Sequence, residues 1–123
     1  MKVLKWKIAE PPNFTSVPEK AGIYIISTKQ VVDKAYEVKY VGQADNLRLR
    51  ANDHWSKKET NEKLKEHIAE KYVMKFNYSE VDSKSDRIGM VLYMHEIYSP
   101  PFNKPLLGEG VIKCTLPGVR KSL

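Results

Sequence analysis

The sequence predicts a small α+β domain in which helices pack on one β-sheet. Two observations lead to this fold class: apolar segments with alternating polar positions, typical of strands, and charged segments with apolar residues at helical spacing. These segments follow one another in the order strand, strand, helix, helix, strand, helix. A chain of 123 residues is long enough for one such domain with a single core.

The first two strands are predicted at 22–28 and 35–42. The segment GIYIIST is rich in β-branched and aromatic residues, and the segment AYEVKYVG alternates aromatic or apolar residues with charged ones. Because only a short connection separates the two segments, we expect them to pair as an antiparallel hairpin.

Two helices are predicted after this hairpin. The segment ADNLRLRANDHWSK is expected to form the first, because Asp45 or Asn46 offers a side-chain oxygen that can cap free amides of the first turn. The second is a strongly charged helix at 60–72, with Leu64 and Ile68 on its apolar side.

A third strand and a third helix complete the predicted domain. The alternation in 72–81 indicates a strand that is covered on one face. The segment 83–98 is apolar on most sides and is therefore expected to be the most buried helix. Ser83 is placed to cap its start, and Pro100 with Pro101 prevents its continuation.

The chain is predicted to divide into a lead-in segment, one domain and a tail. The lead-in is 1–20, in which 10–20 holds three prolines and is expected to lack regular structure. The domain spans 21–105. In the tail, 106–123, the segment 110–116 can form an edge strand.

The composition favours a chain that does not cross a membrane, since no apolar run approaches the roughly 20 residues that a spanning helix needs. A single cysteine, Cys114, cannot form a disulfide within the chain, which suits a reducing compartment such as the cytoplasm. The net charge of +6 favours a polyanionic partner such as nucleic acid, although a basic surface that serves solubility alone explains the charge equally well.

Arg50 and His54 are four residues apart on the first predicted helix, so they lie on the same helix face. Two potential cations at one place are unfavourable unless an anion joins them or the histidine stays neutral. A phosphodiester is a suitable anion, because arginine can bind two of its oxygens and histidine can exchange a proton near physiological pH. Alternatively, both are ordinary surface side chains on a solvated face.

Tyr24 and Tyr40 lie on the two strands of the predicted hairpin, and a glycine stands close to each in the sequence. Two phenols from paired strands can face a common site, where a shifted pKa allows one of them to bind or activate a water. Alternatively, they are residues of the core or of the sheet surface.

These residues resemble the motifs of the GIY-YIG nuclease superfamily. The similarity consists of GIY at 22–24, YVG at 40–42, Arg50 with His54, and the closing segment YSPPFN at 98–103. The superfamily includes the N-terminal incision domain of the bacterial excision-repair nuclease, several homing endonucleases and some restriction enzymes. The resemblance implies a three-stranded antiparallel sheet flanked by helices.

The resemblance also implies a chemistry, the metal-dependent hydrolysis of DNA phosphodiester bonds with Mg²⁺ or Mn²⁺. Tyr24 or Tyr40 would position or deprotonate the attacking water, and Arg50 would stabilise charge on the phosphate. His54 would assist proton transfer, and Asn103 would support the geometry of the site. The metal ion would act as a Lewis acid on a phosphate oxygen.

One position departs from the family pattern. The family holds its metal ion with a glutamate on the last helix, about three turns before the motif asparagine, and the sequence has Val91 at that distance from Asn103. Valine offers no oxygen to a hard cation such as Mg²⁺. Val91 is instead expected to join Ile88, Leu92 and His95 on the core-facing side of the helix.

Three explanations of this departure remain open. The helix can be shifted so that Asp86 or Glu96 supplies the carboxylate. His95 can serve a softer metal ion than Mg²⁺. Otherwise the metal site is lost and no cofactor is needed.

The sequence therefore leaves two main functions, an endonuclease and a nucleic-acid-binding or protein-interaction module of the same fold that cleaves weakly or not at all. For the first, the metal ligands stay unknown, with His95 and Glu96 as candidates. DNA is the expected partner, and a chaperone-like or structural domain with no nucleic-acid role stays a third alternative. Arg48, Lys57 and Lys58 can line a groove for the phosphate backbone, or they form a solvated basic face.

Overall fold

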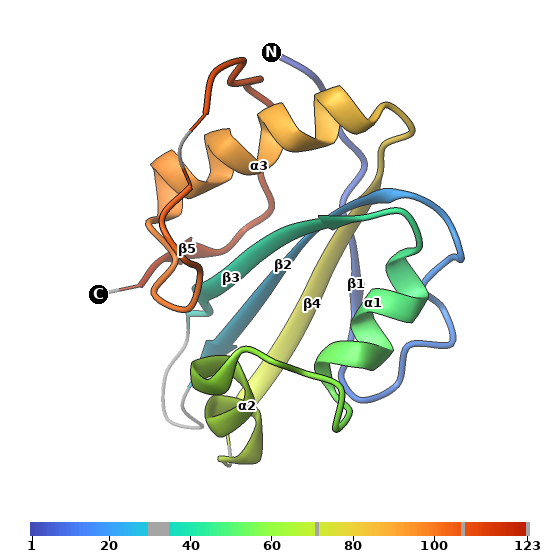
Figure 1. The fold of residues 1–123 in the computed structure, drawn as a ribbon, viewed down its shortest axis with the longest axis vertical. Coiled ribbons are helices and arrows are strands. Elements are labelled where there is room, and N and C mark those ends of the chain that lie inside the picture. The colour runs from blue at the N-terminus through green and yellow to red at the C-terminus, as the bar shows by residue number, and fades with distance from the viewer. Residues whose placement is uncertain (30–34, 71, 107, 123) are drawn as a thin grey trace.

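The computed structural model describes residues 1–29, 35–70, 72–106 and 108–122. Within these residues, one sheet has the strand order β1-β4-β2-β3-β5, and three helices pack around it (Figure 1). The strands are β1 Lys7–Ala9, β2 Gly22–Lys29, β3 Glu37–Ala44, β4 Val73–Glu80 and β5 Arg120–Lys121. The helices are α1 Leu47–His54, α2 Glu62–Ala69 and α3 Lys84–Tyr98. The predicted α+β class and the order of its main elements are confirmed.

The predicted number of three strands is wrong, because the sheet has five. The three long strands do form an antiparallel centre, in which β2 lies between β3 and β4. The other two are short edge strands: β1 pairs antiparallel with β4, and β5 pairs parallel with β3. Strands of three and two residues are too short for an alternating pattern to predict them.

The tail meets the rest of the chain in two places. In 110–116, considered above as an edge strand, the structure has an isolated parallel bridge between Cys114 and Lys2. The strand of the tail is β5, whose Arg120 amide donates to the Tyr36 carbonyl next to β3. β5 therefore pairs with the first residues of β3.

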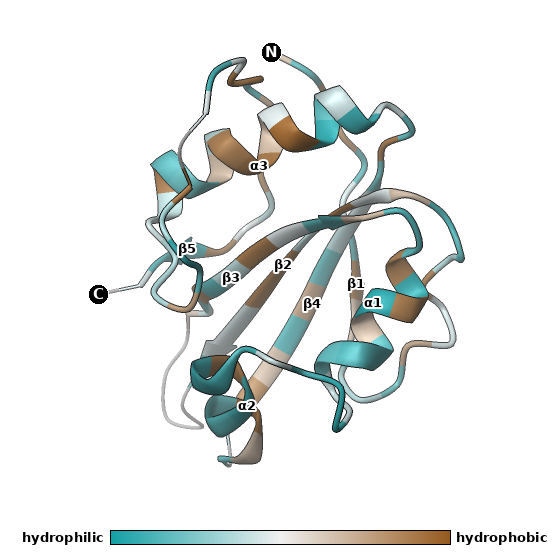
Figure 2. Ribbon diagram, viewed as in Figure 1, coloured by the Kyte–Doolittle hydropathy of each residue, from teal (hydrophilic) through white to brown (hydrophobic). Residues whose placement is uncertain are grey.

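The alternation along β2 divides the core into two clusters, one on each face of the sheet. Tyr24 and Ile26 point to the face covered by α1, α2 and the lead-in loop. Ile23 and Ile25 point to the opposite face, which α3 and the tail cover. In Figure 2 α3 carries several apolar stretches, whereas most of α2 is hydrophilic.

Side chains cap the starts of all three helices as the sequence predicted for α1 and α3. Asn46 accepts a hydrogen bond from the Leu49 amide at the start of α1. Ser83 accepts one from the Asp86 amide at the start of α3. Such caps satisfy amides that have no partner within the helix. The α1 cap matters most here, because it fixes where the first helix leaves β3.

Helix α3 is more exposed on one side than the sequence predicted. Val91 and Leu92 are both 8% exposed, but Ile88 is 46% exposed. The expectation that Ile88 faces the core is therefore wrong, because α3 lies on the sheet with one side only. In the described part of the chain, no helix combines the length and the apolar character needed to span a membrane.

Candidate active site

Tyr24 and Tyr40 lie on neighbouring strands and belong to the face of the sheet that α1 covers. In the β2–β3 pairing, Tyr24 is opposite Gly42 and Tyr40 is opposite Ile26. The two rings stack, with centroids 6.1 Å apart and an interplanar angle of 26°. Tyr24 is 1% exposed, whereas Tyr40 is only partly buried. Of the two phenols, Tyr40 is therefore the one that a molecule in solution can reach.

The glycines of the two motifs, Gly22 and Gly42, are required by the close approach of neighbouring groups. A Cβ atom on Gly42 would lie 2.5 Å from the hydroxyl oxygen of Tyr24. A Cβ atom on Gly22 would lie 2.6 Å from a methyl carbon of Leu47, at the start of α1. The two glycines thus let the Tyr24 phenol cross β3 and let α1 approach the sheet.

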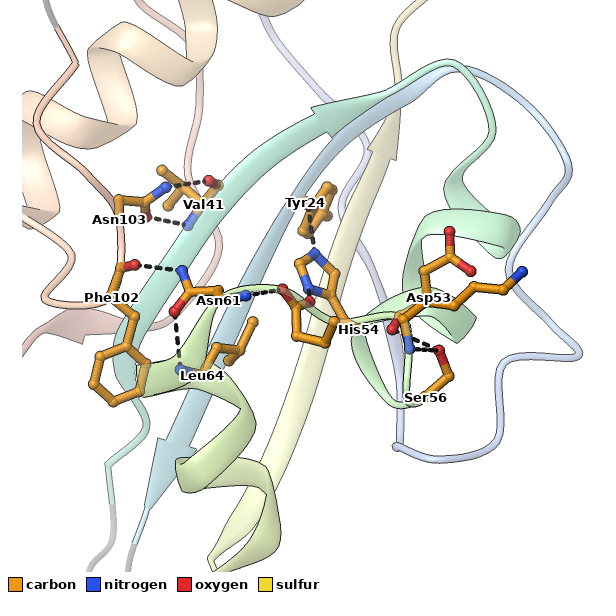
Figure 3. A network of polar contacts seen from close by, with 11 residues as sticks. Tyr24, Val41, Asp53, His54, Ser56, Asn61, Leu64, Phe102 and Asn103 are labelled. Atoms are coloured by element: carbon orange, nitrogen blue, oxygen red, sulfur yellow. Dashed lines mark hydrogen bonds and ion pairs between the residues drawn. The ribbon is translucent and has the colours of Figure 1, made fainter.

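Arg50 and His54 lie one turn apart on α1, so their side chains leave the helix on the same side. His54 is 1% exposed, and its Nε2 atom lies 2.7 Å from the Tyr24 hydroxyl oxygen (Figure 3). The imidazole also meets the Tyr40 ring edge-on, with centroids 5.1 Å apart. Arg50 is half-buried. The structure therefore brings Tyr24, Tyr40, Arg50 and His54 together.

Glu59, which the sequence analysis missed, completes this group from the loop between α1 and α2. Its Oε2 atom pairs with His54 Nδ1, and its Oε1 atom accepts a hydrogen bond of 2.8 Å from the Asn61 amide. The Glu59 side chain is 2% exposed. A loop between helices has no periodicity that predicts the direction of a side chain, so the sequence offered no signal for this carboxylate.

The surroundings of His54 keep its imidazole neutral near neutral pH. Burial and then the Arg50 charge lower the pKa of His54 below its ordinary value, although the Glu59 carboxylate acts in the opposite direction. Arg50 stays a cation: burial lowers the pKa of its guanidinium, but the two phenols and Glu59 together raise it by more. The site thus holds one guanidinium and one buried carboxylate, and it avoids two adjacent cations.

The Tyr24 phenol stays protonated in this site. Burial raises its pKa well above the ordinary value, and the neighbouring Tyr40 adds to this increase. The positive charge of the Arg50 guanidinium lowers the pKa of Tyr24, but by less. Tyr24 therefore has a proton to donate.

Gly42→Ala is expected to displace the Tyr24 ring and to break its contact with His54. The added methyl group overlaps the Tyr24 hydroxyl, and overpacking of this kind lowers the free energy of unfolding by about 1 to 3 kcal/mol. Urea unfolding measures the loss. Gly118→Ala is the matched control, because a Cβ atom there meets nothing within 4 Å. Equal stabilities of the two variants would contradict the close approach.

The side chain of Asn61 links α2 to the segment after α3. Its Oδ1 atom accepts from the Leu64 amide and so caps α2, and its Nδ2 donates to the Phe102 carbonyl at 2.7 Å (Figure 3). Its backbone amide is the donor to Glu59 described above. Asn61 thus ties the loop that carries Glu59 to the chain that runs beside β3.

Asn103 lies at the outer edge of β3 and not against the phenols. Its Oδ1 atom accepts from the Val41 amide at 2.8 Å, and its Nδ2 donates to the Val41 carbonyl at 2.9 Å. The Phe102 amide donates to the Lys39 carbonyl of the same strand. Asn103 therefore acts like one residue of a further strand, and it fixes the part of β3 that carries Tyr40.

Among the three basic residues considered for nucleic-acid binding, Arg48 differs from the lysines. The Arg48 guanidinium donates to the Val17 and Thr15 carbonyls at 2.7 and 3.1 Å, so it holds the lead-in loop against α1. Lys57 and Lys58 follow the end of α1 and are exposed. Of these three residues, Lys57 and Lys58 are the ones that present their charge to solution.

The residues considered as metal ligands, Asp86, His95 and Glu96, all belong to α3, and none of them is fully buried. Val91 packs in the cluster on the α3 face of the sheet, whereas Tyr24 and Tyr40 belong to the cluster on the other face. Glu96 is exposed, and His95 is partly buried. Asp86, in the first turn of α3, is partly buried as well. In the described residues, no three His, Cys, Asp or Glu side chains group as ligands of one ion.

Comparison with protein families gives one match. The model of the GIY-YIG catalytic domain matches residues 20–96, which include the two tyrosines, Arg50 and His54. Searches of curated proteins and of solved structures found no match. The matched segment begins just before β2 and ends within α3, so it contains the three central strands, α1, α2 and most of α3.

Nucleases with this domain generally use a divalent metal ion, so the oxygen atoms of the site are compared with what such an ion needs. Glu59 is the carboxylate in contact with His54, and both of its oxygens already have partners. It is also buried behind the imidazole. A hard cation prefers free carboxylate oxygens and water, so the described residues of this site do not fit the metal ion of the family.

Proposed function

Because the chain belongs to the GIY-YIG family, we propose that it is a DNA endonuclease whose active site consists of Tyr24, Tyr40, Arg50 and His54. Hydrolysis adds one water across a phosphodiester P–O bond and leaves one phosphate end and one hydroxyl end. The observation that supports this proposal is the convergence of the four side chains, in which the buried His54 lies 2.7 Å from the Tyr24 hydroxyl. A surface that served solubility alone would not need a buried, paired histidine.

The four residues of the site differ in exposure, and this difference supports a different role for each. Arg50 and Tyr40 are the partly exposed members, so Arg50 binds the non-bridging phosphate oxygens and Tyr40 positions the attacking water. Tyr24 and His54 are each 1% exposed and act behind them. His54 assists proton transfer through the Tyr24 phenol, because it is neutral and can accept a proton.

Lys57 and Lys58 fit the entry of a DNA backbone to this site. Both are exposed and follow directly on the end of α1, which carries Arg50. With a net charge of +6, the chain attracts a polyanion, and the two lysines add contacts to flanking phosphates. As the substrate class we infer branched or damaged DNA, as in repair. The single cysteine, Cys114, is buried and free, which suits the reducing cytoplasm.

A nicking assay tests this proposal. Supercoiled plasmid is incubated with the protein in Mg²⁺, in Mn²⁺ and with a chelator. We expect slow conversion to the nicked form, because Val91 stands where the family pattern has its metal-binding glutamate. If the DNA is bound but is not nicked in Mg²⁺ or in Mn²⁺, the endonuclease proposal is wrong.

A second function, a DNA-binding module that does not cleave, is favoured by one observation. Val91 occupies the position of the metal-binding glutamate and is buried in the cluster on the α3 face. For such a module, affinity for DNA falls steeply as salt is raised, since each neutralised phosphate releases counterions. Fluorescence anisotropy at several salt concentrations, run beside the nicking assay, separates the two functions.

A further inference from the structure

Both oxygens of the Glu59 carboxylate have hydrogen-bond partners, and these contacts also determine which nitrogen of His54 carries a hydrogen. One oxygen pairs with His54 Nδ1, and the other accepts from the Asn61 amide. A carboxylate has only acceptors, so the Nδ1 atom that faces it carries a hydrogen. A neutral imidazole has one hydrogen, and its Nε2 atom is then an acceptor.

The tautomer of His54 determines which way the Tyr24 hydroxyl points. Tyr24 Oη lies 2.7 Å from His54 Nε2, and with a bare Nε2 the phenol must be the donor. The lone pairs of the phenol oxygen are then free on the side away from His54. Arg50, whose positive charge acts on this phenol, has donors only. The phenol oxygen therefore offers its lone pairs, and not its hydrogen, to a donor such as Arg50.

We infer that Glu59 is a positioning residue that sets the direction of the hydrogen bond between His54 and Tyr24, and thereby which part of the Tyr24 hydroxyl faces Arg50. The inference rests on the proposed function only for its effect on cleavage. The opposite tautomer would place a hydrogen on Nε2 and turn the Tyr24 hydroxyl hydrogen toward the donors of Arg50. The phenol hydrogen would then face the guanidinium, which has donors only, and the orientation of Arg50 toward a phosphate would change.

Glu59→Gln tests this inference, because the Asn61 amide determines how the glutamine side chain is oriented. A glutamine at 59 must offer its carbonyl oxygen to the Asn61 amide, because that amide is a donor in a fixed backbone. Its NH₂ group then faces His54 Nδ1, which becomes an acceptor, and the hydrogen moves to Nε2. The isosteric change therefore reverses the tautomer of His54 and leaves the fold in place.

Long-range ¹H–¹⁵N spectra of the imidazoles report the tautomer, and the chain has only three histidines to assign. In the wild-type protein we expect His54 to be protonated at Nδ1 and bare at Nε2. In Glu59→Gln we expect the reverse. An Nε2-protonated His54 in the wild type, or an unchanged tautomer in Glu59→Gln, would overturn the inference.

Two further variants separate Glu59 from other causes. Glu66→Gln makes the same change on the exposed side of α2 and is expected to leave the His54 spectrum unchanged. Tyr24→Phe removes the phenol hydroxyl but keeps Glu59, so His54 is expected to stay protonated at Nδ1. A tautomer that changes in Tyr24→Phe would show that the phenol, and not Glu59, sets it.

Cleavage supplies the second measurement. We expect Glu59→Gln to lower the nicking rate by a factor of about a hundred, a typical loss for a misdirected acid–base group. Affinity for DNA is retained, because Lys57 and Lys58 are unchanged and one negative charge is removed. If the wild-type protein does not nick DNA, the proposed function fails, while the tautomer spectra still support or overturn the role of Glu59.

Discussion

Arg50→Ala is expected to lower the rate of DNA nicking by a factor of about a thousand, the upper end of the loss caused by removing one group that stabilises transition-state charge. Arg50 is the half-buried cation of the site and the member that can reach both the phenols and the solvent. Negative charge builds up on the phosphate oxygens during attack by water. Without the guanidinium, the described site has no other cation in contact with Tyr24.

Nicking rates at saturating DNA measure this effect separately from binding. Lys57→Ala is the matched control, because it removes one exposed positive charge close to the end of α1 and is expected to change affinity more than rate. Arg50→Lys keeps the charge but loses the planar fork of donors, so it is expected to recover only a small part of the rate. Equal rates for Arg50→Ala and Lys57→Ala would contradict the role of Arg50.

The sequence predicted the convergence of Tyr24, Tyr40, Arg50 and His54 because each of these residues lies on a regular element. Strand alternation and helical spacing fix the direction of side chains on such elements. In the structure the four side chains do lie together, and Gly42 leaves the room that the Tyr24 phenol needs to cross β3. The catalytic roles of the four residues stay a prediction that the assays above address.

Glu59 and Asn61 show what the sequence could not predict. Both lie in the connection between α1 and α2, where neither the two-residue period of a strand nor the helical period applies. Glu59 pairs with a side chain of α1, and Asn61 donates to a carbonyl that follows α3. The family motif led us to expect that Asn103 supports the site. Its two hydrogen bonds to the backbone of Val41, however, depend on the path of the chain after α3. Contacts of this kind appear only when the tertiary structure is known.

The short strands and the exposure of α3 were missed for a related reason. β1 and β5 exist because β4 and β3 offer them free edges, and not because of any pattern of their own. Ile88 is exposed although the surrounding sequence is apolar, because the sheet meets α3 on one side only. An apolar helix predicts burial, but the sequence does not say how many neighbours the helix will have.

Val91→Glu is expected to destabilise the protein by about 3 kcal/mol or more and not to create Mg²⁺-dependent nicking. The residue is 8% exposed and packs with Ile25 and Val41 in the cluster between α3 and the sheet. A carboxylate placed there loses its hydration. Arg87, a buried cation one turn earlier on α3, already donates to Gln43, to Asp45 and to the Val81 and Asp82 carbonyls. Tyr24 and Tyr40 lie in the other cluster, so the new carboxylate does not face them.

Ile88→Glu on the same helix is the matched control for this last expectation. Ile88 is 46% exposed and one turn from Val91, so the same carboxylate is expected to change the free energy of unfolding by no more than about 0.5 kcal/mol. Val91→Thr keeps the shape of valine and is expected to cost about 1 kcal/mol, since it buries a hydroxyl and not a charge. Urea unfolding ranks the three variants. A stable Val91→Glu protein that nicks DNA rapidly in Mg²⁺ would show that α3 carries its carboxylate to the phenols, and it would restore the metal site of the family in this chain.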